Sequence, residues 1–337
     1  MLRSMYSGIS GLRNSQTKLD VVGNNIANVN TYGFKKGRIT FKDMVSQNMA
    51  GATGSSIPAT NIGGVGGTNP RQVGLGAQIA SIDTIATQGN LQTTNRTLDL
   101  GISGDGYFTV YDGSGTPFYT RAGNFYLDAD GNLVSSEGYS LIGQMYIAVP
   151  QNVGDVPSGE VPAGVPSANP TVQPGQNGGA VDPQDRKLFI PSEVTHIQKR
   201  DPQTGAITYT KVQAPATNPK LKSFSIGQDG TINAIYEGDI QPRVIGQIQL
   251  TKFANAEGLE KVGGNLYTVS ANSGEPQELW PRSGGSGSVV SGTLEMSNVD
   301  LSEEFTEMIV GQRSFQANSR IITTSDEILQ ELVNLKR

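Results

Sequence analysis

The feature of the sequence that most constrains the fold is an apolar stripe with a heptad repeat at each end. Near the amino terminus, apolar residues recur at alternating steps of three and four, interrupted by Gln16 and Gly23. The stripe residues are Leu2, Met5, Ile9, Leu12, Leu19 and Ile26. Near the carboxyl terminus the same stepping runs from Leu301 to Val333 and includes Phe305, Met308, Phe315, Ile322 and Leu329. This period predicts two long helices that pack along one side, with these residues forming an assembly seam.

The two end segments carry opposite charge. Residues 1–42 hold seven basic residues and one acidic residue, whereas residues 300–337 hold seven acidic and four basic residues. Opposite charges favour pairing of one end with the other over pairing of like ends. Asp300 and Glu303 have the spacing of a capping box and predict where the second helix begins. On charge and period alone, two ordinary solvated helices on a globular core remain the alternative.

Between the ends, the sequence is typical of short strands and tight turns. The chain has 43 glycines among 337 residues, and turn residues separate short apolar runs. Residues 107–111 and 118–120 flank an Asp-Gly-Ser-Gly turn, and residues 125–133 contain an Asp-Gly turn that returns at 224–232. These patterns predict β-hairpins. We therefore expect a mainly β protein with paired long α-helices from both termini, built as an elongated subunit with discontinuous β domains.

Composition suggests where these parts begin and end. Seven of the 17 prolines fall within residues 150–185, which contain little that could fill a core. The predicted parts are terminal helices forming an inner core (1–36 and 298–337), an extended arm (37–97), a shared β domain (98–143 and 220–282), an inserted outer β unit (144–219) and a flexible link (283–297).

Few catalytic classes are compatible with the composition. The chain has no cysteine and one histidine, His196, which excludes thiol chemistry, disulfides and multi-histidine metal centres. His196 lies among strand-like residues, so we interpret it as an ordinary surface or core residue. We predict no catalytic residue, cofactor or metal site, and no enzymatic activity.

Two motifs superficially resemble ligand sites. Asp128, Asp130 and Asn132 have the spacing of the first EF-hand ligands, but leucine and tyrosine occupy the positions that need glycine and glutamate. The glycine-rich run at residues 101–106 leads into a strand pattern instead of the helix that a phosphate loop needs. Both are better explained as turns.

Charge and hydropathy limit the partners. A net charge of −5 argues against general nucleic-acid binding, and no apolar run of 18 residues is present to span a membrane. The amino-terminal residues lack the apolar core of a cleaved signal peptide. The basic start could be a transit peptide or a membrane-surface helix, but its glycines and asparagines are weak helix formers.

The segment that ends the first predicted helix resembles a signature of bacterial flagellar rod and hook proteins. That family carries an Asn-Asn-Ile-Ala-Asn core followed by Thr-x-Gly-Phe-Lys. The matching residues here are Asn24, Asn25, Ile26, Ala27, Asn28, Thr31, Gly33 and Phe34. Residues 98–108 and 119–125 resemble the family's shared β domain, and residues 297–302 and 308–313 resemble its carboxyl-terminal motif.

Within that family, the carboxyl-terminal segment from Glu304 to Arg320 is closer to hook subunits than to distal rod subunits. The finish from Thr323 to Arg337 is also similar to hook subunits, notably the shorter Gram-positive kind. The resemblance implies a structural subunit that polymerises into a flexible helical tube carrying torque from rod to filament, with a distal rod subunit as the alternative. Implied partners are further copies of the chain, the rod, hook-cap and hook–filament junction proteins, and the flagellar type III export apparatus. Nucleic acid and membrane insertion are not implied.

The resemblance also implies a location outside the cell in the flagellar hook or basal body, reached without a cleaved signal. Phe41 and Val45 fit a loose Phe-x-x-x-apolar pattern that such subunits present to the export gate; a simple anchor for the arm is the alternative. From another class, a secreted β-rich carbohydrate-binding or depolymerising protein would need an acidic pair or an aromatic platform in a groove. Such a groove would have to gather tyrosines around Trp280, the only tryptophan.

Overall fold

The computed structural model describes residues 2–54, 66–145, 186–193, 196–200, 207–211 and 219–335. It is mainly β with one long helix near each terminus, as predicted. The chain forms two compact units. The terminal unit comprises Met1–Val29, Lys35–Ile85 and Val299–Arg337, and the β unit comprises Asn30–Phe34 and Ala86–Asn298.

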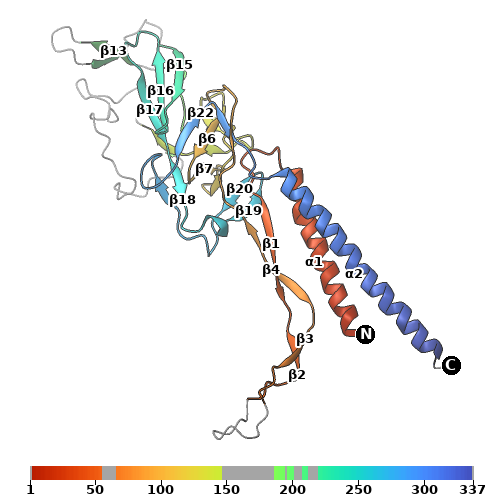
Figure 1. Cartoon of the computed structure of the whole chain (residues 1–337). Coiled ribbons are helices and arrows are strands. Elements are labelled where there is room, and N and C mark those ends of the chain that lie inside the picture. Colours follow the sequence, from red (N-terminus) through yellow and green to blue (C-terminus); the bar gives the residue numbers. More distant parts are fainter. Residues whose placement is uncertain are drawn as a thin grey trace. The chain divides into compact units, whose positions relative to one another are not determined.

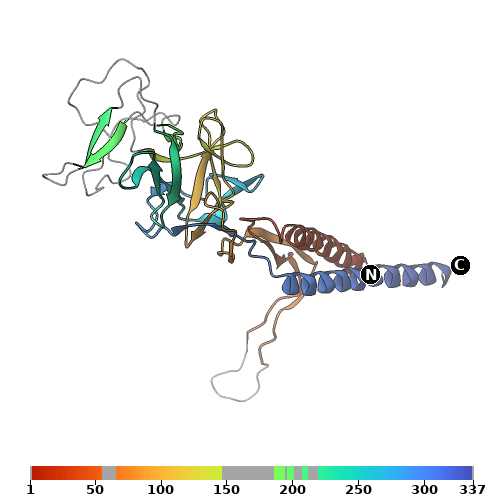
Figure 2. The ribbon, with the colours of Figure 1, turned by 90° about the horizontal axis from the view of Figure 1, so that it is seen from above.

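Two antiparallel helices form the body of the terminal unit. Helix α1 (Leu2–Ala27) and helix α2 (Leu301–Leu335) lie side by side (Figures 1 and 2). The predicted cap begins α2, because the Asp300 carboxylate accepts the backbone N–H groups of Ser302 at 2.8 Å and Glu303 at 3.4 Å. Such a cap satisfies donors that the first helical turn leaves unpaired.

A two-stranded ribbon completes the terminal unit. Strand β1 (Gly37–Asp43) pairs antiparallel with β4 (Ala77–Thr84), with a bulge at Thr40/Phe41. Further along the ribbon, β2 (Ser46–Ala50) pairs with β3 (Arg71–Gly74), and every residue of these two strands is exposed. Two strands alone are marginally stable in water, so the β2–β3 part of the ribbon lacks the cover that α1 provides for β1 and β4.

The β unit is organised around a nine-stranded sheet. Its main path is β19-β20-β8-β7-β11-β10-β9, and β18 pairs with both β7 and β21. The strands are β7 (Tyr107–Tyr111), β8 (Pro117–Thr120), β9 (Tyr126–Leu127), β10 (Leu133–Val134), β11 (Ser140–Leu141), β18 (Leu250–Lys252), β19 (Glu260–Gly263), β20 (Leu266–Thr268) and β21 (Gln277–Leu279). A short 3₁₀ helix, η2 (Ala256–Gly258), precedes β19.

Smaller sheets surround it. A four-stranded antiparallel sheet has the order β12-β17-β16-β15, and three further strand pairs are β5 with β23, β6 with β22, and β13 with β14. Their bounds are β5 (Leu91–Thr93), β6 (Leu100–Ser103), β12 (Gly143–Met145), β13 (His196–Arg200), β14 (Ile207–Lys211), β15 (Leu221–Ile226), β16 (Thr231–Tyr236), β17 (Arg243–Ile248), β22 (Ser288–Ser291) and β23 (Thr293–Glu295).

The predicted hairpins are all present. Strands β7 and β8, β9 and β10, and β15 and β16 form antiparallel pairs across the turns that the sequence indicates. The turn glycines Gly131 and Gly230 both have positive φ, at 83° and 74°. Only glycine adopts this conformation without steric cost, which explains why the same Asp-Gly turn recurs in both halves of the unit.

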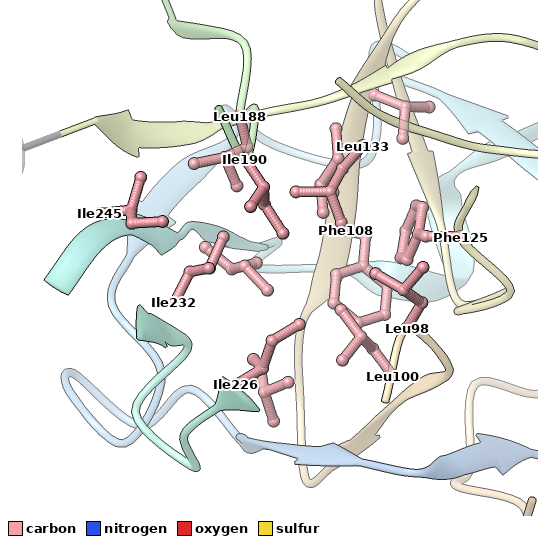
Figure 3. Packing of buried hydrophobic residues seen from close by; sticks show 14 of the residues in the cluster. Leu98, Leu100, Phe108, Phe125, Leu133, Leu188, Ile190, Ile226, Ile232 and Ile245 are labelled. Carbon is pink, nitrogen blue, oxygen red and sulfur yellow. The ribbon is translucent and has the colours of Figure 1, made fainter. Parts of the chain in front are cut away.

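One apolar core joins the nine-stranded and four-stranded sheets. Figure 3 shows their buried residues converging, among them Phe108 of β7 and Ile232 of β16, together with Leu100 of β6 and Phe125, which precedes β9; all four are fully buried. The rings of Phe108 and Phe125 meet edge to face at 5.2 Å. Because side chains alternate along a strand, the opposite face of β7 and β8 builds a second, aromatic core. Its members are Tyr107, Tyr119, Phe253, Leu259 and Tyr267.

Two segments differ from the predicted parts. Leu188 and Ile190 were assigned to an outer inserted unit, but both are buried in the main core beside Leu133 (Figure 3). The expected flexible link at 283–297 contains β22 and β23, which pair with β6 and β5. Val289 is fully buried there, so apolar side chains that follow the Gly/Ser run order this segment. Most of the remaining predicted insert, including residues 146–185, lies outside the described residues.

Candidate assembly surface

Small residues make the closest contact between the two helices. A Cβ atom added at Gly11 would lie 2.6 Å from Asn318 Nδ2, and one added at Gly8 would lie 3.3 Å from Ile322 Cγ1. Ser15 Oγ lies 3.2 Å from Ser314 Oγ on the other helix. The distance between helices depends on the side chains at the contact, so this face allows a close approach.

The facing side of α2 has the same character. Its buried residues are Glu304, Gly311 and Ser325, spaced by multiples of seven. A Cβ atom at Gly311 would lie 3.0 Å from Leu19 Cδ2. The helices therefore meet along a heptad of small and polar residues, which a search for apolar periodicity does not detect.

The predicted stripe residues lie beside this contact. On α1, the half-buried stripe residues are Met5, Ile9, Leu12, Leu19 and Ile26. The side chain of Leu2 lies outside the part that the structure describes. On α2, Met308, Ile322 and Leu329 are half-buried. Phe305 and Phe315 are 50% and 40% exposed. The line of closest contact on α1 runs through Gly8, Gly11 and Ser15, one residue before Ile9, Leu12 and Gln16 of the predicted line, because backbones approach most closely where side chains are small.

Asn25 connects three segments of the terminal unit. Its Nδ2 donates to Gly37 O at 2.9 Å and to Glu304 Oε2 at 3.1 Å, while its Oδ1 accepts the Gly37 N–H at 2.9 Å. The amide thus fixes the first residue of β1 against α1 and α2 at once. A buried side chain that meets all these groups specifies one register, since any slip would leave buried polar atoms unpaired.

Ion pairs between the chain ends follow the predicted charge difference. Lys36 Nζ lies 2.7 Å from Glu303 Oε2 and 3.9 Å from Glu304 Oε1, and Lys18 Nζ lies 3.3 Å from Glu307 Oε2. Burial raises the pKa of Glu304, while the Asn25 hydrogen bond and Lys36 oppose that rise. Partly exposed pairs such as these contribute little stability, so their main effect is on which segments pair.

The rest of the amino-terminal motif explains how α1 ends. Asn28 Nδ2 donates to Asn24 O at 2.9 Å, and Asn28 N–H donates to Asn24 O at 3.2 Å, which closes the last turn after Ile26 and Ala27. The Phe34 N–H then donates to Thr31 O at 3.3 Å and forms a turn.

Gly33 and Phe34 anchor this turn within the β unit. Gly33 has φ of 72°, and an added Cβ would lie 2.6 Å from the Ala122 backbone nitrogen. Its N–H donates to Glu295 O at 2.8 Å. Lys261 Nζ lies 4.9 Å from the centre of the Phe34 ring. The motif glycine is therefore required by both backbone conformation and space.

A buried ion pair explains the arginine within residues 119–125, one of the segments that resemble the family's β domain. Arg121 Nη1 lies 3.1 Å from Glu295 Oε2, and the two side chains are 4% and 0% exposed. Arg121 also donates to Gly104 O at 3.0 Å, and its guanidinium lies 5.2 Å from the Tyr107 ring centre. Glu295 accepts the Gly89 N–H at 2.9 Å. Sequence analysis missed this pair, because 174 positions separate its members.

An apolar groove lies between α1 and the ribbon. Its volume is about 880 Å³, and both α1 and the segment around β4 line it, including Tyr6, Ile9, Arg13, Leu75 and Ile79. Phe41 and Val45 are both exposed on the ribbon, at 42% and 77%. The terminal unit thus leaves apolar side chains exposed at several places, whereas the β unit buries such side chains in its two core clusters.

The rejected ligand motifs have structural roles. The Asp128 carboxylate accepts the Ala129 N–H at 2.7 Å within the β9–β10 turn, and residues 101–106 form most of β6 and the loop that leads to β7. His196 begins β13. Among the residues that the structure places, no cluster of three or more acidic, histidine or cysteine side chains is suited to a metal ion. In the same residues, neither helix is long and apolar enough to cross a membrane.

Comparisons with known proteins match both ends and the β unit. Residues 5–35 match the family described as flagella basal body rod protein, residues 101–161 match the flagellar hook protein FlgE/F/G D1 domain, and residues 290–335 match the flagellar basal body rod FlgEFG protein C-terminal family. The three matched ranges include the signature around Asn25, strands β7 to β12 of the β unit, and α2.

Whole-chain relatives extend the match. The flagellar basal-body rod protein FlgG of Bacillus subtilis is 48% identical, and the alignment covers 100% of both chains. The flagellar hook protein FlgE of Borreliella burgdorferi is 35% identical, again over 100% of both chains. The flagellar hook protein FlgE of Salmonella typhimurium is 30% identical over 99% of this chain and 100% of its own.

Proposed function

This chain belongs to the family of flagellar rod and hook proteins and is a structural subunit of the flagellar axis, and we propose that it is the repeating subunit of the hook. The observation that carries the proposal is the terminal unit. Its helices are fixed to one another by Asn25 and Glu304, yet leave large apolar side chains exposed. Further copies of the chain would cover this surface.

The carboxyl-terminal sequence supports the hook over the rod. The segment from Glu304 to Arg320 resembles hook subunits more than rod subunits, and relatives named as hook proteins align over their full length. The distal rod is the second candidate, and a specific observation favours it. The 48% identical relative is named a rod protein and aligns with this chain over 339 residues, against 449 for the Borreliella hook protein.

In the hook, the subunit would contact the rod at one end of the tube and the hook-cap and junction proteins at the other. It would leave the cell through the flagellar type III export apparatus without a cleaved signal. The exposed positions of Phe41 and Val45 support a role for them at the export gate. The seam residues of both helices would serve assembly, and the subunit would act as a structural element without catalytic activity.

Electron microscopy of basal bodies from a strain that lacks this gene separates hook from rod. Loss of a hook subunit should leave complete rods that end without a hook, and a complementing copy should restore the hook. Gold-labelled antibody against the chain should then decorate the hook of wild-type flagella. Truncated rods in the deletion strain, or label confined to the rod, would instead assign the chain to the distal rod.

A further inference from the structure

Helix α2 extends beyond its partner helix. Gly8 faces Ile322, Gly11 faces Asn318, and Ser15 faces Ser314, which defines an antiparallel register. Continued to the end of α1, this register places Leu2 near Ile328. The last residues of α2, about two turns at 3.6 residues per turn, therefore run past the first residue of α1. Figures 1 and 2 both show α2 reaching beyond that end.

The end of α2 carries an apolar strip. Ile328, Leu332 and Leu335 fall on one side of the helix at helical spacing and are 42%, 47% and 83% exposed. We call these three residues the tail strip. Exposed apolar residues that form a continuous line mark an interaction site more often than residues scattered singly.

The groove between α1 and the ribbon, which we call the ribbon groove, is a suitable acceptor. Tyr6, Ile9, Met44, Leu75 and Ile79 contribute apolar side chains to its lining. Because both a helix and a strand line the groove, a helix laid into it would cover the apolar side chains that α1 and the segment around β4 leave exposed.

The tail strip of the same chain cannot occupy this groove. Tyr6, Ser10, Arg13 and Thr17 line the groove at alternating steps of four and three. The line through these four residues lies about half a turn around the helix from the contact face through Gly8, Gly11 and Ser15, and Ile9, Asn14 and Gln16 line the edges of the groove. Since α2 already covers that contact face, a straight α2 lies on the opposite side of α1 from the groove.

Charge favours the end of α2 as the occupant. Arg13 lines the groove and is exposed, while Glu327 and Glu331 are exposed beside the tail strip. Asp20 lies further along the groove, on the same face of α1 as Arg13. A tail strip entering with its acidic side toward Arg13 and away from Asp20 would have one preferred direction.

We propose that the tail strip of one copy docks in the ribbon groove of a second copy. The proposal rests on the assignment of the chain as an axial subunit and adds a donor and an acceptor surface to it. Since donor and acceptor differ, every added copy leaves one of each unoccupied. Contacts of this kind generate open helical assemblies and not closed pairs.

Cysteine cross-linking in isolated hook–basal bodies tests the contact, because the chain has no cysteine of its own. The variant with Leu332→Cys and Ile79→Cys should give, on mild oxidation, a ladder of disulfide-linked multimers. The matched control pairs Leu332→Cys with Ile82→Cys, which is exposed on the same strand but is not among the groove-lining residues. The control should give at least tenfold less multimer.

The outcomes are distinct. A product that stops at dimers, an equal ladder from the Ile82→Cys control, or no cross-link in assembled structures would each overturn the proposal. So would a ladder formed equally by Ile79→Cys alone, which would mean that ribbons occupy one another's grooves. None of these results depends on whether the antibody locates the chain in the hook or the rod, so failure of the contact and failure of the hook assignment can be told apart.

A substitution pair gives an independent measurement on purified full-length chain. Leu332→Asp should raise the concentration needed for polymerisation at least tenfold, whereas Leu332→Met should change it less than twofold. Circular dichroism should show the same strand content in both monomers. Equal polymerisation of the two variants would exclude a docking role for the tail strip.

Discussion

The β unit buries its apolar side chains within one chain, whereas the terminal unit does not. Both apolar core clusters of the described residues lie wholly in the β unit. In the terminal unit the buried residues are mostly small or polar, such as Ser15, Asn25 and Glu304, while Phe305 and Ile309 are about half exposed. Burial of apolar surface is the main stabilising term in folding, so the β unit should be stable alone and the terminal unit only after assembly.

Removing a phenylalanine ring should affect the two units very differently. Phe108→Ala empties a fully buried site and should lower the free energy of unfolding of the β unit by about 3–5 kcal/mol. Phe305→Ala removes a half-exposed ring and should change monomer stability by less than about 1 kcal/mol. Urea denaturation of the monomers followed by tyrosine fluorescence measures both. Similar losses in the two variants would contradict the contrast between the units.

The buried ion pair of the β unit can be compared with an exposed one. Glu295→Gln leaves the Arg121 charge buried without its partner and should cost about 3 kcal/mol. The control is Asp229→Asn, which breaks the exposed pair with Arg282 at 3.2 Å and should cost less than about 1 kcal/mol. If thermal unfolding gave equal shifts, the Arg121–Glu295 pair would not be a stabilising element of this unit.

A bulky residue in the helix contact should weaken assembled tubes. Gly11→Leu places a side chain where Asn318 already lies and should cost about 1–3 kcal/mol through crowding. Gly23→Leu gains the same helix propensity, but an added Cβ there has no neighbour within 4 Å. The first variant should lower the temperature at which tubes disassemble, and the second should not. The reverse order would mean that the helices do not pack on this face in the tube.

Replacing Glu304 should change, by a small amount, how the stability of tubes depends on pH. Burial raises its pKa in the folded state above the unfolded value of 4.5, so the protonated form is favoured by folding. Its contribution is then fully present below the unfolded pKa and is lost as pH rises through the folded pKa. Glu304→Gln should flatten this part of the stability profile of tubes. An unchanged profile for Glu304→Gln would argue that this carboxyl is solvated.

The local features of this fold were predictable from sequence. Asp-Gly turns such as that at Gly131 need a backbone conformation that few residues adopt, so they identified the hairpins directly. The helix cap at Asp300 and the apolar period predicted α2, because each depends only on residues within one or two helical turns of one another.

Features that depend on distant residues were not predictable. The Arg121–Glu295 pair joins segments far apart in the chain, and Leu188 reaches the core from a segment that the sequence places in an inserted outer unit. The contact face of α1 was displaced by one residue because Gly8 and Ser15 have low hydrophobicity. Their small size, which permits close approach, carries no weight in a hydrophobic pattern.

Hydrogen exchange followed by mass spectrometry, on monomer and on assembled tubes, tests the central contrast most directly. The account predicts that amides of α1 and α2 exchange rapidly in the monomer and are protected in the tube. Amides of β7, β8, β16 and β17 should be protected in both states. Equal protection of the two helices in monomer and tube would show that they are stable within one chain, which would contradict assembly-dependent order of the terminal unit.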